Sequence, residues 1–525
     1  MNYKKVIQYS FFGVVALLLC FSAVAQKPVT AKNLKAITSE KVKAHIDYLA
    51  SDALLGRNTP SPGLDTAAAY IAKEFYRYGL QPVNGSYFNE VPLVITSLGD
   101  DNSVEITRNG ETKMLTIKTE FVPYDFTASA TVEGSLVFAG YGITAPEYNY
   151  DDYANIDVKG KIVVVMRHEP GESDTASLFD GKNSTKYSYN ENKIENAIAH
   201  GAVGMLVVTD PLNHQMINPR GFPWPSLSKI IPKDALAMEL EDSQKLRIPA
   251  IHVGKEIMNL LFGSVDSLKR LQAEIDKSLK PLSRHYPEIS VRMKVTTIQT
   301  PVKSNNVIGL LPGTDPIQKN EYLVIGAHYD HVGFNREHKE GEDYINNGAD
   351  DNASGTAGVL AVAEAFSKMK NRPKRSVLYM AFSGEEKGLF GSQAYARNPL
   401  FPMENTVAML NMDMISRNDP DSLCLEGASL CPDLVDIVKT ENKGIGFKLQ
   451  LNEDNHVGGS DHASFYKKDV PFLFFFAGLH NDYHTVRDNP NTINPDKTAR
   501  IAQLVYKTAW HIANENKRYT IVKKK

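Results

Sequence analysis

The chain lacks a strong charge of either sign. Its 525 residues carry 58 Lys and Arg against 61 Asp and Glu, a formal net charge of −3. Apart from the tail Lys523–Lys525 there is no long basic run, so nothing indicates a nucleic-acid partner. No G-x-S-x-G motif occurs, which argues against a serine hydrolase. The length suffices for two or more domains, and no internal repeat divides it.

No apolar run is long enough to cross a bilayer. The longest near the start, Phe11–Phe21, follows Lys4–Lys5 and precedes the small-residue sequence Ala23–Ala25. This pattern predicts a signal peptide over residues 1–25, an exported protein that is periplasmic or secreted, and no transmembrane anchor after cleavage. Cys20 raises an outer-membrane lipoprotein as an alternative, which the large side chain of Leu19 before it disfavours.

Cysteine is also scarce, with three in the whole chain. Removal of the signal would leave two, Cys424 and Cys431. An oxidising compartment permits them to form a disulfide, and two buried thiols are the equal alternative.

Acidic residues and histidines stand where predicted strands end. Four apolar runs are typical of buried strands: Tyr322–Ala327, Ser376–Phe382, Thr406–Met412 and Val470–Phe476. Apolar residues at helical spacing predict a helix over Gly355–Lys370. Strands alternating with helices predict a parallel sheet, and such sheets bind ligands beyond the carboxyl ends of their strands. We therefore expect one site at that edge.

Five residues at this edge form a candidate metal-ligand set. They are His328, Asp351, Glu386, Asp413 and His484. Imidazole and carboxylate ligands without cysteine suit a catalytic zinc or a similar ion. Five ligands exceed what one open zinc site needs, so we expect two ions, with His328 and Asp413 on one and Glu386 and His484 on the other. Asp351, in a loop rich in small residues, is the expected bridge, and a hydroxide would lie between the ions.

The doublet Glu385–Glu386 predicts a division of roles. A carboxylate that binds metal is a poor base, so Glu386 is assigned to metal and Glu385 to general acid–base catalysis. Asp330 follows His328 by two residues and is expected to accept its second imidazole N–H, which fixes the tautomer. Each residue alone could be a loop residue or a helix cap; the prediction depends on their coincidence at one edge.

These motifs resemble the M28 metallopeptidases, the co-catalytic zinc aminopeptidases. The resemblance covers residues from about 300 to 500, through HYDHVG, NGADDNASG, SGEEKGLFGS, NMDM, GGSDHASF and YHTVRD, and also Leu49–Leu80. It implies a zinc-exopeptidase-like α/β fold, a mixed and largely parallel sheet between helices, and two zinc ions per chain. It also adds Tyr483 as a candidate oxyanion donor.

The region between these blocks is richer in β-structure. Short strands are predicted at Ser135–Tyr141, Lys161–Met166, Gly204–Val208 and Leu246–Val253, with helices at Ile194–His200 and near Lys255–Lys277. The segments AIAHGAVGMLVV and IPAIHV resemble a protease-associated (PA) domain. We therefore expect a catalytic domain in two parts, residues 35–94 and 291–520, with a PA-like insertion at 95–290 that acts as a lid or a substrate-sorting surface.

The leading functional hypothesis is an exported aminopeptidase acting on peptides. Two enzymatic alternatives stay open: a carboxypeptidase for acidic peptides, which needs arginines such as Arg336, Arg417 and Arg487 to converge on a carboxylate, and a single-zinc glutaminyl cyclase-like transferase. A binding or scaffold protein would show broken ligand positions, and these positions are filled.

Overall fold

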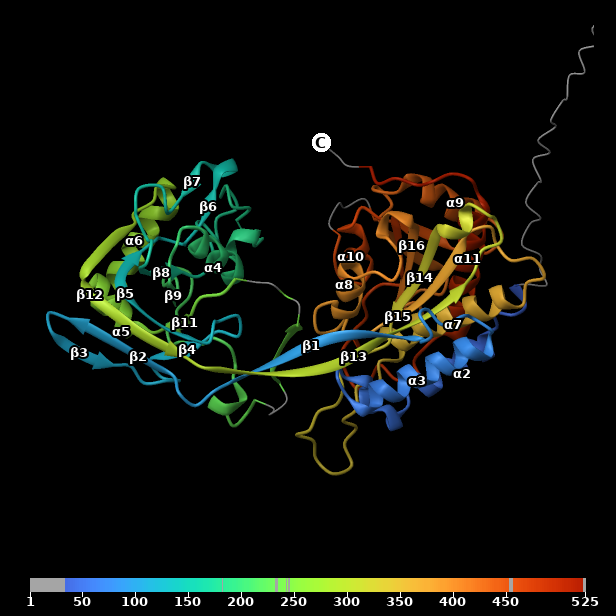
Figure 1. Ribbon diagram of the computed structural model, residues 1–525, viewed down its shortest axis with the longest axis horizontal. Helices are drawn as coiled ribbons and strands as arrows, with labels where there is room; N and C mark the ends of the chain where they lie inside the picture. The colour runs from blue at the N-terminus through green and yellow to red at the C-terminus, as the bar shows by residue number, and fades with distance from the viewer. Residues whose placement is uncertain are drawn as a thin grey trace, which may run out of the picture.

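The computed structural model describes residues 34–522 except 182, 232–234, 242, 244–245 and 453–456. The predicted signal peptide and its cleavage site lie outside the described residues. Two lobes stand side by side, joined by the long antiparallel strands β1 (Phe88–Leu98) and β13 (Thr297–Leu311) (Figure 1). Among the described residues, no helix is both long enough and apolar enough to cross a membrane.

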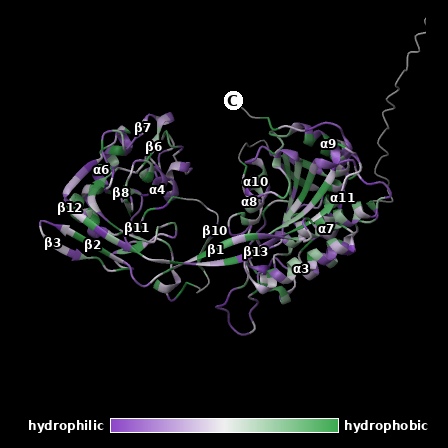
Figure 2. Ribbon diagram, viewed as in Figure 1, coloured by the Kyte–Doolittle hydropathy of each residue, from purple (hydrophilic) through white to green (hydrophobic). Residues whose placement is uncertain are grey.

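The first lobe is built on a sheet with strand order β10-β1-β13-β15-β14-β16-β19-β17-β18. Its centre consists of the parallel strands β15 (Ser376–Phe382), β14 (Tyr322–His328), β16 (Thr406–Asp413) and β19 (Phe472–Phe476). These strands are almost entirely buried and appear hydrophobic in Figure 2. The mixed α/β fold expected from the alternating strands and helices is confirmed. The strands could be recognised in the sequence because a strand covered on both faces is a continuous apolar run.

Helices cover this sheet. The helices α2 (Ser39–Leu49), α7 (Gly355–Ser367) and α11 (Pro495–Asn514) contact one another, and α3 (Pro62–Arg77) packs on β13. Two short helices, α8 (Phe390–Arg397) and α10 (His462–Tyr466), contact each other elsewhere on the sheet. Further along, α9 (Pro432–Asn442) packs against α11, and β17 (Ser422–Glu426) pairs with β18 (Lys448–Leu451). Cys424 and Cys431 are both free thiols.

The second lobe carries a sheet with strand order β3-β2-β12-β5-β8-β9-β11-β4. Its strands are β2 (Ser103–Arg108), β3 (Glu111–Met114), β4 (Phe121–Pro123), β5 (Ala130–Phe138), β8 (Ile162–Met166), β9 (Gly204–Val208), β11 (Ala250–Val253) and β12 (Arg284–Val295), beside a small β6 (Thr144–Ala145) and β7 (Tyr150–Asp151) pair. Alternate residues face opposite sides: Leu136 and Phe138 join a core with α5 (Lys255–Phe262) and α6 (Val265–Ser278), whereas Val137 joins one with α4 (Asn190–Ala199). This lobe therefore has its own double-sided core.

Two expectations about this lobe need correction. The single helix expected near Lys255–Lys277 is two helices, α5 (Lys255–Phe262) and α6 (Val265–Ser278). Gly263 ends α5 in a left-handed conformation (φ 79°), and Ser264 caps α6 through its side chain. The residues predicted as the start of β11, from Leu246, are irregular until Ala250.

One strand from within the predicted insertion belongs to the first lobe. β10 (Ala237–Leu240) pairs antiparallel with β1 and is the edge strand of the nine-stranded sheet. Leu240 packs with Val91, Leu93 and Phe390, so it contacts α8, the helix that follows the Glu385–Glu386 loop. β10 thus brings a part of the chain that follows β9 of the second lobe to the neighbourhood of the predicted site.

Candidate metal centre

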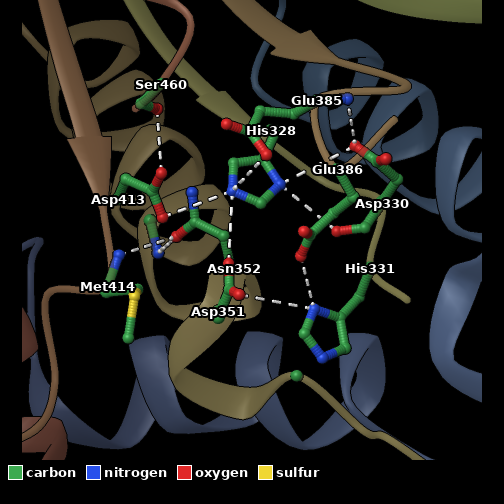
Figure 3. Close-up of polar contacts among 12 residues, drawn as sticks. His328, Asp330, His331, Asp351, Asn352, Glu385, Glu386, Asp413, Met414 and Ser460 are labelled. Atoms are coloured by element: carbon green, nitrogen blue, oxygen red, sulfur yellow. Dashed lines mark hydrogen bonds and ion pairs between the residues drawn. The ribbon is translucent and has the colours of Figure 1, made fainter. Parts of the chain in front are cut away.

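The five predicted ligands lie together at the carboxyl edge of the central strands. His328 and Asp413 are the last residues of β14 and β16, and Glu386 follows β15. Asp351 lies in the loop before α7, and His484 lies in the loop after β19. Figure 3 shows Asp351, Asp413 and Glu386 around the imidazole of His328.

Asp351 stands between two pairs of residues. Its Oδ1 atom lies 3.3 Å from Nε2 of His328, and its Oδ2 atom lies 3.1 Å from Nε2 of His484. His328 Nε2 is also 3.3 Å from Oδ1 of Asp413, and His484 Nε2 is 2.9 Å from Oε2 of Glu386. Each oxygen of Asp351 therefore faces a different histidine–carboxylate pair, which is the arrangement expected of a carboxylate that bridges two ions.

The loop that carries Asp351 is fixed by hydrogen bonds. Asp488 accepts hydrogen bonds from the backbone N–H groups of Asp350 and Asp351, at 2.9 and 3.0 Å. Asn352 accepts hydrogen bonds from Gly355 N and Met414 N and donates one to the carbonyl of Met412, which ties the loop to the end of β16. The loop that carries Asp351 is thus held by Asp488, by the start of α7 and by the end of β16.

The donor set fits divalent metal ions. Asp413 Oδ1 and Asp351 Oδ2 are buried oxygens without a hydrogen-bond partner, although imidazole nitrogens lie close by. Burial alone would lower the pKa of His328, but the carboxylates of Asp413 and Glu385 outweigh it and raise that pKa well above its usual value. Burial alone would also lower the pKa of His484, but the nearby carboxylates of Asp351 and Glu386 prevail and raise it to about 10. The carboxylates of this site therefore favour positive charge between them, and a bound metal ion would supply that charge.

Glu385 differs from its neighbour Glu386. Its side chain is 11% exposed, and its Oε2 atom lies 3.9 Å from Nε2 of His328. Burial raises the pKa of Glu385 well above its usual value; His328 opposes this shift, and the Asp413 and Glu386 carboxylates add to it. A carboxylate with a raised pKa beside a metal site is suited to take up and release a proton near neutral pH.

Asp330 does not make the hydrogen bond expected of it. Its carboxylate lies 3.7 Å from Nδ1 of His328, whereas its main-chain carbonyl oxygen is nearer, at 3.3 Å. The carboxylate instead accepts hydrogen bonds from Glu385 N and from the Thr59 hydroxyl, both at 3.1 Å. Asp330 thus positions the backbone of Glu385 and offers His328 its carbonyl, because the turn after β14 directs the side chain toward the β15 loop.

Tyr483 lies on the open side of the centre. Its ring stacks on His484 with centroids 3.8 Å apart, and 39% of the residue is exposed. Burial of the hydroxyl raises the pKa of Tyr483, and the Asp351 and Glu386 carboxylates raise it further. The phenol therefore stays protonated and can donate a hydrogen bond near the ligands.

Three residues that hold the predicted ligands or their loop were not identified from the sequence. His331, fully buried, lies with its Nδ1 atom 2.8 Å from Oε1 of Glu386 (Figure 3). Asp488 holds the bridging loop, as described above. Ser460 donates a hydrogen bond to Oδ2 of Asp413 at 2.8 Å. All three lie within the motifs HYDHVG, YHTVRD and GGSDHASF, and this position within the motifs was the only feature of the sequence that could have pointed to them.

Comparison with known proteins supports the resemblance. Residues 306–509 match the sequence model of Peptidase family M28, and residues 132–261 match that of the PA domain. Aminopeptidase YwaD of Bacillus subtilis (strain 168) is 24% identical over 408 residues, which are 74% of this chain and 72% of that protein. Leupeptin-inactivating enzyme 1 of Streptomyces exfoliatus is 30% identical over 188 residues, and the match spans 39% of its length.

The fold also matches a solved structure. The aminopeptidase from Aneurinibacillus sp. strain AM-1 aligns with a TM-score of 0.53 at 21% identity, covering 93% of this chain and 97% of that one. The alignment includes both lobes. The predicted resemblance to an M28 peptidase with a PA domain is therefore confirmed.

Proposed function

We propose that this chain, whose residues 306–509 match the model of Peptidase family M28, is an exported aminopeptidase that releases single residues from peptide N-termini. The position of Asp351 supports this proposal most strongly, with one carboxylate oxygen facing His328 and the other facing His484. This arrangement suits two metal ions, with His328 and Asp413 on one and Glu386 and His484 on the other. A glutaminyl cyclase-like single-ion site would not need both pairs.

Zinc is the metal that we propose, because the ligands combine imidazole and carboxylate groups without thiolate. When bound, two such ions would activate a water molecule and polarise the scissile carbonyl group. The likeness to relatives named as aminopeptidases supports this choice of chemistry.

Glu385 would carry the proton between the two reaction partners. Its carboxylate takes a proton from the attacking water and gives it to the leaving amine. Its backbone N–H donates a hydrogen bond to Oδ1 of Asp330, which fixes the main chain at Glu385. Such a base contributes about 10²–10⁴-fold to the rate. Tyr483 would donate a hydrogen bond to the carbonyl oxygen as charge develops there.

The charges of the site favour an N-terminal amine over a C-terminal carboxylate. Glu385, Glu386 and Asp413 surround the centre and attract a protonated amine. Of the arginines that a carboxypeptidase would need, Arg417 and Arg487 both form ion pairs with Asp482, at 2.6 and 2.7 Å. These two guanidinium groups are committed to Asp482, which leaves Arg336, beside the cavity described next, as the one arginine of the three placed toward a substrate carboxylate, fewer than the carboxypeptidase alternative expects.

A cavity of about 590 Å³ beside the centre offers space for the substrate. Val332 and Gly333 border it from the loop after His331, and Lys387 borders it next to Glu386. Met238 of β10 and Ile95 of β1 form part of its wall. The segment from the inserted region therefore helps to shape the space in which a peptide would lie, consistent with a substrate-sorting role.

The test compares three substrates: an amino-acid anilide, its N-acetylated form, and a peptide ending in an acidic residue. Cleavage of the free anilide alone supports the proposal. Release of the acidic C-terminal residue alone would support a carboxypeptidase. Hydrolysis of the acetylated anilide at a similar rate would rule out aminopeptidase specificity.

Export rests on the sequence pattern of residues 1–25 and needs a separate test. N-terminal sequencing of the protein recovered from the cell envelope and the medium should find a mature chain that starts at Gln26. A chain that begins with a lipidated Cys20 would support the lipoprotein alternative instead.

A further inference from the structure

A second group of potential metal ligands lies in the inserted lobe, outside the M28 domain. It consists of His168, Glu172, Asp210 and His214. One ligand atom from each lies within 4.8 Å of every other. We name these four residues the distal cluster. Nothing in the proposed peptidase chemistry uses it.

The sheet topology brings the distal cluster together. His168 and Asp210 each lie two residues past the ends of β8 and β9, which are neighbouring parallel strands. The carboxyl edge of a parallel sheet is where ligands bind in such folds. Glu172 and His214 each follow four residues later, and a turn with His214 N donating to Asp210 O at 3.2 Å brings His214 back toward Asp210.

The distances suit one small cation. His168 Nδ1 lies 2.9 Å from Asp210 Oδ1 and 3.7 Å from Glu172 Oε2. His214 Nε2 lies 2.8 Å from Glu172 Oε2 and 3.6 Å from Asp210 Oδ2. Ligand atoms about 2.0–2.2 Å from a tetrahedral zinc are about 3.3 Å apart, which falls inside this range.

Asp210 supplies an independent indication of a ligand. It is 1% exposed, and its Oδ2 atom is buried without a hydrogen-bond partner. A buried carboxylate oxygen without a partner is costly unless a cation or water satisfies it. The two imidazole rings stack with centroids 4.2 Å apart, so two protonated rings would repel each other, whereas two neutral rings can share one ion.

The backbone of His168 is held in an unusual conformation that presents the ring to the cluster. Its φ angle is 53°, in the left-handed region that residues other than glycine seldom adopt. The buried amine of Lys193 donates hydrogen bonds to the carbonyl groups of His168, Met166 and Tyr141, which fixes this turn. Strained residues of this kind gather at binding sites.

We propose that the distal cluster binds one divalent transition-metal ion, with Zn²⁺ the best match to two imidazoles and two carboxylates. The ion would join the loops after β8 and β9. The second of these loops begins the segment that leads to β10 and the first lobe, so the ion would anchor that segment at its origin. Three side chains are partly exposed, at 19% for His168, 25% for Glu172 and 35% for His214, which lets an ion enter.

The experiment measures metal content in the full mature chain by mass spectrometry after loading with Zn²⁺ and gel filtration. The proposal expects one zinc equivalent to be lost in His168→Ala/His214→Ala. His285→Ala is the matched control, because His285 is exposed in β12 of the same lobe and lies outside the cluster. Unchanged zinc content in the double variant would overturn the proposal.

Two further variants separate this result from other causes. His328→Ala/His484→Ala removes the M28-type ligands and should still retain one equivalent, so the distal site can be scored even if the peptidase proposal fails. Asp210→Asn keeps the shape of the side chain and should weaken zinc binding at least tenfold, with an unchanged circular dichroism spectrum. If Asp210→Asn binds zinc as tightly as the parent protein, the four residues form a hydrogen-bonded cluster without a metal.

Discussion

His331 Nδ1 lies 2.8 Å from Oε1 of Glu386. The other oxygen of that carboxylate faces His484 at 2.9 Å, and His331 Nδ1 also lies 3.6 Å from Oδ2 of Asp351, so His331 adjoins both carboxylates proposed to hold this ion. Hydrogen bonds that orient a ligating group typically account for 10–100-fold in metal affinity.

Replacing His331 should therefore weaken metal binding while leaving the five proposed ligands in place. We expect His331→Ala to lower zinc affinity by about 10–100-fold, measured by competition with a chelator. His338→Ala is the control, since His338 is an exposed histidine of the following loop. Equal affinity in the parent and in His331→Ala would show that Glu386 needs no such support.

The two adjacent glutamates should respond differently to the same substitution. Glu385→Gln preserves size and leaves the proposed ligands intact, so metal should stay bound while kcat falls by about 10²-fold or more. Glu386→Gln should weaken the binding of one ion. Metal content and single-substrate kinetics on both variants check this. The opposite pattern, metal loss only in Glu385→Gln, would reverse the two roles.

Arg57 should be important for the stability of the first lobe. Its fully buried guanidinium donates hydrogen bonds to the carbonyl groups of Leu49, Tyr329, Asn347 and Gly348, and so joins the N-terminal segment to both ligand loops. Burial lowers the pKa of Arg57 to about 10, which leaves it charged at neutral pH.

Arg57→Met would leave several buried carbonyl groups without donors, at about 1–3 kcal/mol each. We expect the free energy of unfolding to fall by about 3 kcal/mol or more, measured by urea titration. Arg77→Ala serves as the comparison, because its side chain is 59% exposed and its ion pair with Glu74 should contribute less than about 1 kcal/mol. Similar losses in both variants would contradict the role given to Arg57.

The pH dependence of stability should reflect His45. Burial lowers the pKa of His45 to about 4, and its ring nitrogens contact the hydroxyl groups of Tyr70 and Tyr78 at 2.7 and 3.2 Å. The folded state thus favours the neutral ring. Its stabilising effect is complete above the unfolded pKa of about 6.5 and is lost as the pH falls toward 4.

His45→Gln keeps a polar side chain that does not titrate in this range. The parent protein should lose about 3 kcal/mol more than the variant between pH 7 and pH 4, measured by denaturant titration at each pH. Parallel pH profiles of parent and variant would show that His45 does not contribute to the acid sensitivity.

The sequence predicted those parts of the structure that depend on short-range pattern. β15 and β9 match their predicted bounds, and the five ligand positions follow from the rule that sites lie at the carboxyl ends of parallel strands. A buried strand is a continuous apolar run, so its end is visible in the sequence. The residue that follows the end is then easy to place.

What depends on long-range contacts could not be predicted in this way. Arg57 lies nearly 300 residues before Asn347, and no local pattern joins them. The return of β10 to β1 and the meeting of His168 with Asp210 likewise depend on strand order and register. The sequence correctly placed Asp330 next to His328, but it is the main-chain carbonyl of Asp330, not its carboxylate, that lies nearest the ring. The direction of a side chain after a strand is set by the turn geometry, which the sequence pattern does not show.

The most direct test of the account is a crystal structure of the zinc-loaded protein with anomalous diffraction at the zinc edge. We predict two anomalous peaks in the first lobe, one on each side of the Asp351 carboxylate, with His328 and Asp413 at one and Glu386 and His484 at the other. A single peak there, or two peaks that do not share Asp351, would contradict the account.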